Sequence, residues 1–103
     1  MTYQPRSLYS LHSQGEEIYY QYGEHTPERS RLMAQILAAS SGYTIAQPTG
    51  LASHGGLKDW FIDKFCRPGF TIEIGRGKNP LDIGQFEHIY AKTQEMLIIA
   101  TLL

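Results

Sequence analysis

The sequence predicts an α/β fold in which a partial mixed sheet is flanked by helices. Short β-prone apolar stretches alternate along the chain with longer stretches whose apolar residues recur at helical spacing. Strands and helices interleaved in this way are typical of a sheet with helices packed on its faces. Because no repeat, linker or low-complexity tract interrupts residues 1–103, we expect them to belong to one domain.

Four segments are predicted to be strands. Each is short, is rich in apolar, aromatic or β-branched side chains, and is bounded by turn residues. Between them, the stretches rich in glycine and proline are predicted to be loops. The predicted strands are residues 7–11, 18–22, 43–46 and 70–74.

The last predicted strand alternates between apolar and polar residues. This alternation places Phe70, Ile72 and Ile74 on one face of the sheet, and Thr71 and Glu73 on the other. Glutamate is depleted in strands and is rarely buried without a partner. Glu73 is therefore a candidate for chemistry, and the alternative is an exposed carboxylate on an edge strand.

Three stretches are predicted to be helices. The first should begin with Thr26 as its N-cap and Pro27 in its first turn, and should end at Gly42. The second should span residues 57–65, and the third should begin near Asp82. The side chains expected on their buried faces are Leu32, Met33, Ile36 and Leu37 in the first, Leu57, Trp60, Phe61 and Phe65 in the second, and Ile83, Phe86, Ile89, Tyr90, Met96 and Leu97 in the third.

Charge and cysteine content argue against several classes of partner and site. The formal net charge of -1 gives no electrostatic reason to expect nucleic acid or an anionic membrane as a partner. No apolar run approaches the roughly 18 residues of a membrane span. Cys66 is the only cysteine, so an internal disulfide and a multi-cysteine zinc site are both impossible. A reducing compartment such as the cytoplasm is slightly favoured, but the localisation stays open.

His12 and Glu73 both stand where functional groups gather in α/β sheets. His12 directly follows the predicted strand 7–11, and Glu73 lies near the end of its own strand. Sites in such sheets form beyond the carboxyl ends of the strands. A glycine-containing loop follows each residue and leaves room for a ligand. For His12 alone, a hydrogen-bonded structural histidine is the alternative to a metal ligand.

Three motifs, taken in order, resemble the zinc carboxypeptidase family. Within that family, the run from His12 to Tyr19 is most similar to the bacterial γ-D-glutamyl-diamino acid endopeptidases, which cut peptidoglycan stem peptides next to meso-diaminopimelate. The three motifs are Leu11-His12-Ser13-Gln14, Gly55-Gly56-Leu57-Lys58-Asp59-Trp60 and Phe70-Thr71-Ile72-Glu73-Ile74-Gly75.

The resemblance implies a zinc metallopeptidase of the carboxypeptidase type acting on a peptide. His12 would be one zinc ligand, and Glu73 would activate a zinc-bound water for attack on an amide carbonyl. Ser13 and Thr71 would line the substrate side of this site. Gly56 belongs to the segment that shapes the specificity pocket in the family.

Lys58 matches the base of that specificity pocket. A positive charge there would favour a substrate side chain that ends in a carboxylate, as diaminopimelate does. The alternative is an ordinary solvated lysine on a helix surface.

The family pattern also requires residues that this chain does not supply in the expected order. A His-x-x-Glu pair of zinc ligands precedes the histidine-serine step in the family, whereas the match at 25–28 follows His12. Pro27 and Glu28 suit the start of a helix, which is the preferred interpretation of that match. Leu51 stands where the type members carry a mobile tyrosine.

The chain is accordingly expected to be the C-terminal part of a catalytic domain that is inactive in isolation. An exposed apolar sheet edge should then contact the missing upstream part or a second copy. The alternative is a catalytically incomplete fragment that acts as a structural or peptide-binding module.

Overall fold

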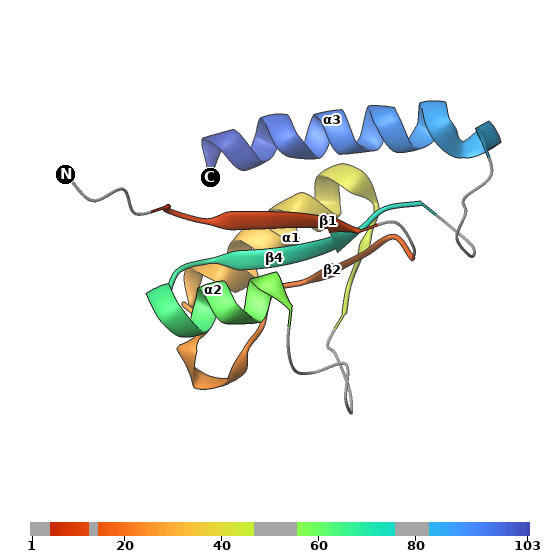
Figure 1. Ribbon diagram of the computed structural model, residues 1–103. Helices are drawn as coiled ribbons and strands as arrows, with labels where there is room; N and C mark the ends of the chain where they lie inside the picture. The colour runs from red at the N-terminus through yellow and green to blue at the C-terminus, as the bar shows by residue number, and fades with distance from the viewer. Residues whose placement is uncertain (1–4, 13–14, 47–55, 76–82) are drawn as a thin grey trace.

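The computed structural model, which describes residues 5–12, 15–46, 56–75 and 83–103, has the predicted α/β architecture. A four-stranded mixed sheet carries helices on both faces (Figure 1). The strands are β1 (Leu8–His12), β2 (Glu17–Tyr19), β3 (Thr44–Ile45) and β4 (Gly69–Glu73), and the longer helices are α1 (Arg29–Ser41), α2 (Leu57–Phe65) and α3 (Phe86–Leu102).

The strands lie in the order β1-β4-β2-β3. β4 pairs in parallel with β1 on one side and antiparallel with β2 on the other, and β2 pairs in parallel with β3. The strand that comes last in the chain is thus inserted between the first two. This insertion brings residues from three separate segments next to one another.

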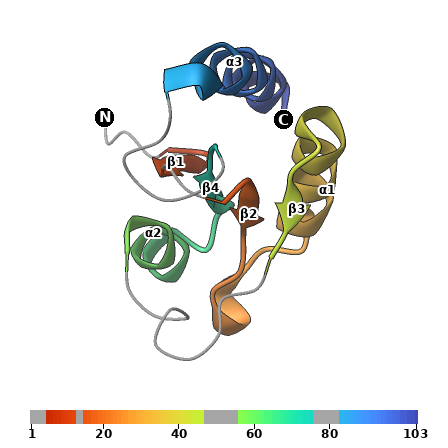
Figure 2. The same cartoon turned by 90° about the vertical axis from the view of Figure 1, so that its right-hand side faces the viewer.

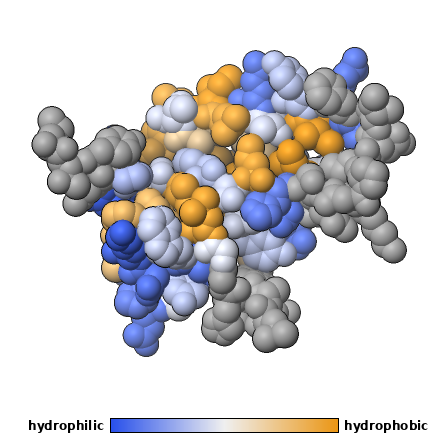
Figure 3. All heavy atoms as spheres, viewed as in Figure 1, coloured by the Kyte–Doolittle hydropathy of each residue, from blue (hydrophilic) through white to orange (hydrophobic). Residues whose placement is uncertain are grey.

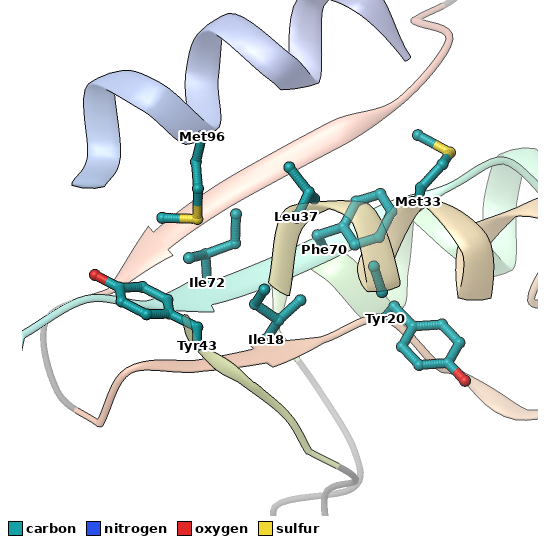
Figure 4. Packing of buried hydrophobic residues seen from close by; sticks show 9 residues of the cluster. Ile18, Tyr20, Met33, Leu37, Tyr43, Phe70, Ile72 and Met96 are labelled. Atoms are coloured by element: carbon teal, nitrogen blue, oxygen red, sulfur yellow. The ribbon is translucent and has the colours of Figure 1, made fainter. Parts of the chain in front are cut away.

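One face of the sheet forms the hydrophobic core beneath α1 and α3. Phe70 and Ile72 of β4 are 0% and 1% exposed, as their alternation predicts, and the ring of Tyr9 stacks on Phe70 at 5.1 Å. Figure 4 shows Phe70 and Ile72 facing Met33 and Leu37 of α1 and Met96 of α3. The buried cluster comprises Ile18, Tyr20, Met33, Ala34, Leu37, Tyr43, Phe70, Ile72 and Met96.

α2 lies on the opposite side of the sheet from α1 (Figure 2). It buries Phe61 and Ile62 against the beginning of β4, and Gly69 permits this close approach. A Cβ at position 69 would stand 3.1 Å from Cγ1 of Ile62 and 3.3 Å from Cδ1 of Phe61, which is tighter than the usual separation of packed carbon atoms and would push these side chains back.

The predicted start of the first helix is wrong by a few residues. α1 begins at Arg29, and the Thr26 hydroxyl accepts a hydrogen bond from the Tyr22 backbone N–H at 2.6 Å instead of capping the helix. The predicted end is confirmed. Gly42 has a left-handed conformation, and its N–H donates to the Ala38 carbonyl.

Each predicted buried face includes side chains that are buried, but several residues assigned to these faces are exposed. Leu32, Leu57, Trp60, Tyr90 and Leu97 are all more than 40% exposed. In α2 the buried residues include Lys58 and Asp59, which form an ion pair. Because the two opposite charges compensate one another, the pair can be buried. The positions of the apolar residues alone therefore did not identify the buried face of α2. Figure 3 shows hydrophobic and hydrophilic residues side by side on the face seen in Figure 1.

The last helix begins later than predicted. α3 starts at Phe86, after a short 3-10 turn at Ile83–Gln85. Asp82, together with the side chains of Ile83 and Phe86, lies outside what the structure describes. None of the helices in the described ranges has the length and apolar character needed to cross a bilayer.

Candidate functional site

The pairing of β1 with β4 brings His12 and Glu73 side by side. They form the last pair of the parallel register, in which Ser10 and Thr71 are partners on the same face. The sequence had placed His12 just after the strand, but His12 is the final residue of β1. The Ile74 N–H donates to the His12 carbonyl at 2.7 Å, so backbone hydrogen bonding fixes the two strand ends together.

The antiparallel pairing of β2 with β4 adds two further polar residues to this face. Glu17 lies opposite Glu73, and Tyr19 lies opposite Thr71. Their side chains alternate with Ile18, which is fully buried in the core. We call the resulting array the polar face; it comprises Ser10, His12, Glu17, Tyr19, Thr71 and Glu73.

α2 covers only part of the side of the sheet that carries the polar face. Its contacts with Gly69 lie at the beginning of β4, four residues before Glu73. Figure 1 shows α2 beside the start of β4, while the arrowheads of β1 and β4 point away from it. The carboxyl ends of these two strands are therefore the part of this side that α2 leaves accessible.

The surroundings of Glu73 favour its protonated form. Partial burial raises the pKa of the Glu73 carboxyl, the nearby His12 lowers it, and the negative charge of Glu17 raises it again. A carboxylate with a raised pKa holds a proton more strongly than an ordinary surface glutamate does. Glu73 is therefore suited to act as a general base toward water.

Tyr19 is linked to the same pair of carboxylates. Its hydroxyl donates to Oε1 of Glu17 at 3.4 Å. Burial raises the pKa of the Tyr19 phenol, and the charges of Glu17 and Glu73 raise it further. Tyr19 therefore stays a neutral donor across the physiological pH range.

His12 has the properties of one metal ligand. Its Nε2 lies 3.2 Å from the Ser10 hydroxyl, and histidines that bind metals commonly hold their second ring nitrogen in such a hydrogen bond. His12 is exposed at the sheet edge, where an ion can approach. In the described part of the chain, no group of three or more His, Cys, Asp or Glu side chains could hold a metal. His12 thus fits one position of a zinc site, and the described residues do not complete it.

Lys58 is buried, which rules out the solvated surface lysine considered from sequence. It is 6% exposed, and its Nζ donates to the Gln21 carbonyl at 2.5 Å and to Oδ1 of Asp59. An ammonium group has three donors, so these two bonds leave one N–H for a further acceptor. The ammonium therefore faces the chain segment that directly follows β2.

The remaining predicted site residues are only partly defined. Gly56 precedes α2 with φ +88, a conformation that favours glycine, and is exposed. Thr71 lies on the polar face, as predicted. Ser13 falls outside the described residues.

The partners of His25 lie at the C-terminal end of α2 and are not residues of the polar face. Its Nε2 lies 3.6 Å from Oδ1 of Asp63, and its Nδ1 lies 3.9 Å from Sγ of Cys66. The sequence had suggested no partner for Cys66, because these residues are far apart along the chain. Opposite ring nitrogens face the two partners, so one ion cannot bind all three side chains at once.

A cavity of about 300 Å³ lies away from the polar face, between β1, α1 and α3. Tyr9 and Met33 belong to its walls, and Arg6 and Arg29 add positive charge. Tyr9 alternates with Ser10 and therefore lies on the core side of β1. No residue of the polar face lines this cavity.

Sequence reasoning missed Ser10, Glu17 and Tyr19. The available signal was period-two alternation: Ser10 shares a face with His12 along β1, and Glu17 shares one with Tyr19 along β2. That Glu17 faces Glu73 depends on the insertion of β4 between the two strands, which no local pattern reveals.

Two known proteins are similar to this chain. It is 40% identical over 93 residues to the uncharacterized protein YqgT of Bacillus subtilis (strain 168), covering 90% of this chain and 25% of that protein. It is 42% identical over 81 residues to γ-D-glutamyl-L-diamino acid endopeptidase 1 of Lysinibacillus sphaericus, covering 79% of this chain and 20% of that protein. The chain therefore spans a quarter or less of the length of these relatives. No protein-family profile matches it.

Proposed function

We propose that this chain carries part of the active site of a zinc-dependent peptidase of the carboxypeptidase type. The bond cut would be the amide between a γ-D-glutamyl residue and a diamino acid, as found in peptidoglycan stem peptides. The observation that carries the proposal is the register that pairs His12 with Glu73 at the accessible end of the polar face. The relative from Lysinibacillus sphaericus, named as an endopeptidase of this specificity, supports the substrate class.

Each residue of the pair has a defined part in this reaction. The imidazole of His12 would supply one zinc ligand, with Ser10 holding its other nitrogen. Zinc, when bound, would polarise the scissile carbonyl and make water easier to deprotonate. Glu73 accepts the proton of the attacking water and later delivers a proton to the departing amine. Its raised pKa strengthens it as a base.

Lys58 is proposed to select substrates that carry a carboxylate. Its one remaining N–H can donate to an anionic oxygen in a charge-assisted hydrogen bond. Lys58→Asp in the complete protein should lower kcat/KM beside diaminopimelate about 10- to 100-fold more than beside a neutral residue. Equal losses on both substrates would make Lys58 a structural residue whose ammonium serves only Asp59 and Gln21.

Within the described residues β1 is the outermost strand on its side of the sheet, and we propose that its edge receives the polypeptide that completes the metal site. β1 stands at one end of the strand order, and Leu11 is 43% exposed on it. An unpaired edge offers backbone groups to a further strand. We propose an additional segment of the same protein as the occupant, because the relatives are at least four times longer than the matched region. Self-association along this edge is the alternative.

Zinc binding and hydrolysis together test the proposal. The complete protein containing this chain should cleave a γ-D-glutamyl-diaminopimelate peptide, lose activity to a chelator and regain it with zinc. His12→Ala should lower the zinc content and the activity together, whereas an exposed residue of the same type, in His88→Ala, should leave both unchanged.

The 103-residue chain alone should bind zinc weakly and hydrolyse no peptide. Stoichiometric zinc that survives dialysis of this chain would contradict the proposal that ligands come from elsewhere. A complete protein that binds peptides but never cleaves them, with or without zinc, would favour a structural or peptide-binding module instead.

A further inference from the structure

Glu17 occupies a position in which a second carboxylate carries an energetic cost. It lies directly opposite Glu73 in the antiparallel register of β2 and β4. Like charges that face each other across a strand pair destabilise the sheet. The Tyr19 hydrogen bond offsets part of this repulsion, but the facing of two carboxylates does not itself stabilise the sheet, which makes Glu17 a candidate for a role in the site.

The carboxylate of Glu17 retains capacity to accept hydrogen bonds. Tyr19 donates to Oε1, whereas a carboxylate can accept about four such bonds. Within residues 5–12, 15–46, 56–75 and 83–103, no lysine, arginine or histidine side chain forms an ion pair with Glu17. Lys58 is already held by Asp59. A ligand cation would therefore meet an acceptor that is only partly satisfied.

Gly15 lies directly against the carboxylate of Glu17 and close to the side chain of Glu73. A Cβ at this position would stand 3.2 Å from Oε1 of Glu17 and 3.8 Å from Cβ of Glu73. The backbone there has φ +120, a conformation that few residues other than glycine adopt. The Gly15 N–H donates to the Gly75 carbonyl at 2.8 Å, which fixes the turn next to both carboxylates. A side chain at position 15 would crowd the Glu17 carboxylate, whereas glycine leaves its oxygens uncovered on that side.

We propose that Glu17 is a specificity-determining residue that binds the second, unacylated ammonium group of a diamino acid next to the scissile bond. This inference rests on the proposed function. A diamino acid whose α-amino group is acylated by the γ-carboxyl of D-glutamate keeps its other amino group free and positively charged at neutral pH. A carboxylate beside the general base complements that charge, whereas a substrate with one amino group gains nothing from it.

Two substrates that differ only in this ammonium test the inference. The complete protein is assayed with γ-D-glutamyl-diaminopimelate and with γ-D-glutamyl-2-aminopimelate, which keeps the distal carboxylate and lacks the second amine. Glu17→Gln should lower kcat/KM for the first peptide about 10- to 100-fold and for the second less than about threefold. Glu17→Asp should retain part of the preference, because it keeps the charge.

Glu24→Gln is the matched control, because it removes an exposed carboxylate from the 3-10 turn after β2 and should change neither rate. Equal losses on both peptides for Glu17→Gln, or no loss on either, would overturn the inference while the proposed function stands. If the wild-type protein cleaves neither peptide in the presence of zinc, the proposed function and this inference fail together. Thermal unfolding of each variant shows whether a uniform loss reflects a damaged fold.

Discussion

The two faces of β4 perform opposite tasks with alternating residues of one strand. Phe70 and Ile72 are buried beneath α1 and α3 and stabilise the fold through apolar contact. Thr71 and Glu73 lie on the polar face among other side chains that can exchange protons or bind ligands. Once the core face is buried, strand pairing alone is therefore enough to assemble a candidate site from three segments of the chain.

Phe70 should tolerate substitution far less than its neighbour on the polar face. Phe70→Ala removes a fully buried ring from the centre of the core and leaves a cavity, so we expect a loss of about 3–5 kcal/mol in the free energy of unfolding. Thr71→Ala should cost less than about 1 kcal/mol. Urea unfolding of the 103-residue chain measures both. Similar losses in the free energy of unfolding for the two substitutions would show that the two faces of β4 do not differ in their contribution to stability.

Breaking the buried ion pair of Lys58 and Asp59 should destabilise the fold about as much as a substitution in the hydrophobic core, although both residues are charged. Asp59→Ala leaves the Lys58 ammonium buried without its counterion, and we expect a loss of about 3 kcal/mol. Replacing both residues, as in Lys58→Met with Asp59→Leu, should recover most of that loss. A double variant as unstable as Asp59→Ala would show that the two charges do not act as a pair.

Substitution of Glu73 should change the free energy of unfolding least, and it should increase it instead of lowering it. Because its pKa is raised in the fold, its ionised form destabilises the folded state at neutral pH. Glu73 is only partly buried and solvent screens its charge, so Glu73→Gln should raise the free energy of unfolding at pH 7 by no more than about 0.5 kcal/mol. This gain should shrink as the pH falls through the raised pKa of Glu73, where the wild-type side chain becomes protonated. A variant less stable than wild type at pH 7 would contradict the assignment.

Much of the fold could be predicted from local pattern. Alternation in residues 70–74 correctly assigned the two faces of β4, and Gly42 correctly marked the end of α1. The burial of Lys58 could not be predicted, because it depends on Asp59 and on a carbonyl 37 residues away along the chain. Glu17 was missed for the same reason: its closeness to Glu73 is a property of strand order, which sequence periodicity does not encode.

The two ends of the polar face differ in how many of the interacting groups belong to the described residues. Toward β2, Glu17, Tyr19 and Glu73 form a cluster defined by register and hydrogen bonding. Toward β1, His12 is exposed at the sheet edge, with Ser10 as its hydrogen-bond partner. We propose that further metal ligands join from that edge, so zinc affinity should depend on the complete protein much more than the geometry of the Glu17–Glu73 pair does.

Turnover by Glu73→Gln in the complete protein, measured together with its zinc content, is the decisive test of Glu73 as the general base. If Glu73 is the general base of a zinc peptidase, kcat on a γ-D-glutamyl-diaminopimelate peptide should fall about 100- to 10,000-fold while zinc stays bound. Turnover close to that of the wild type, with zinc retained, would show that Glu73 takes no part in the reaction.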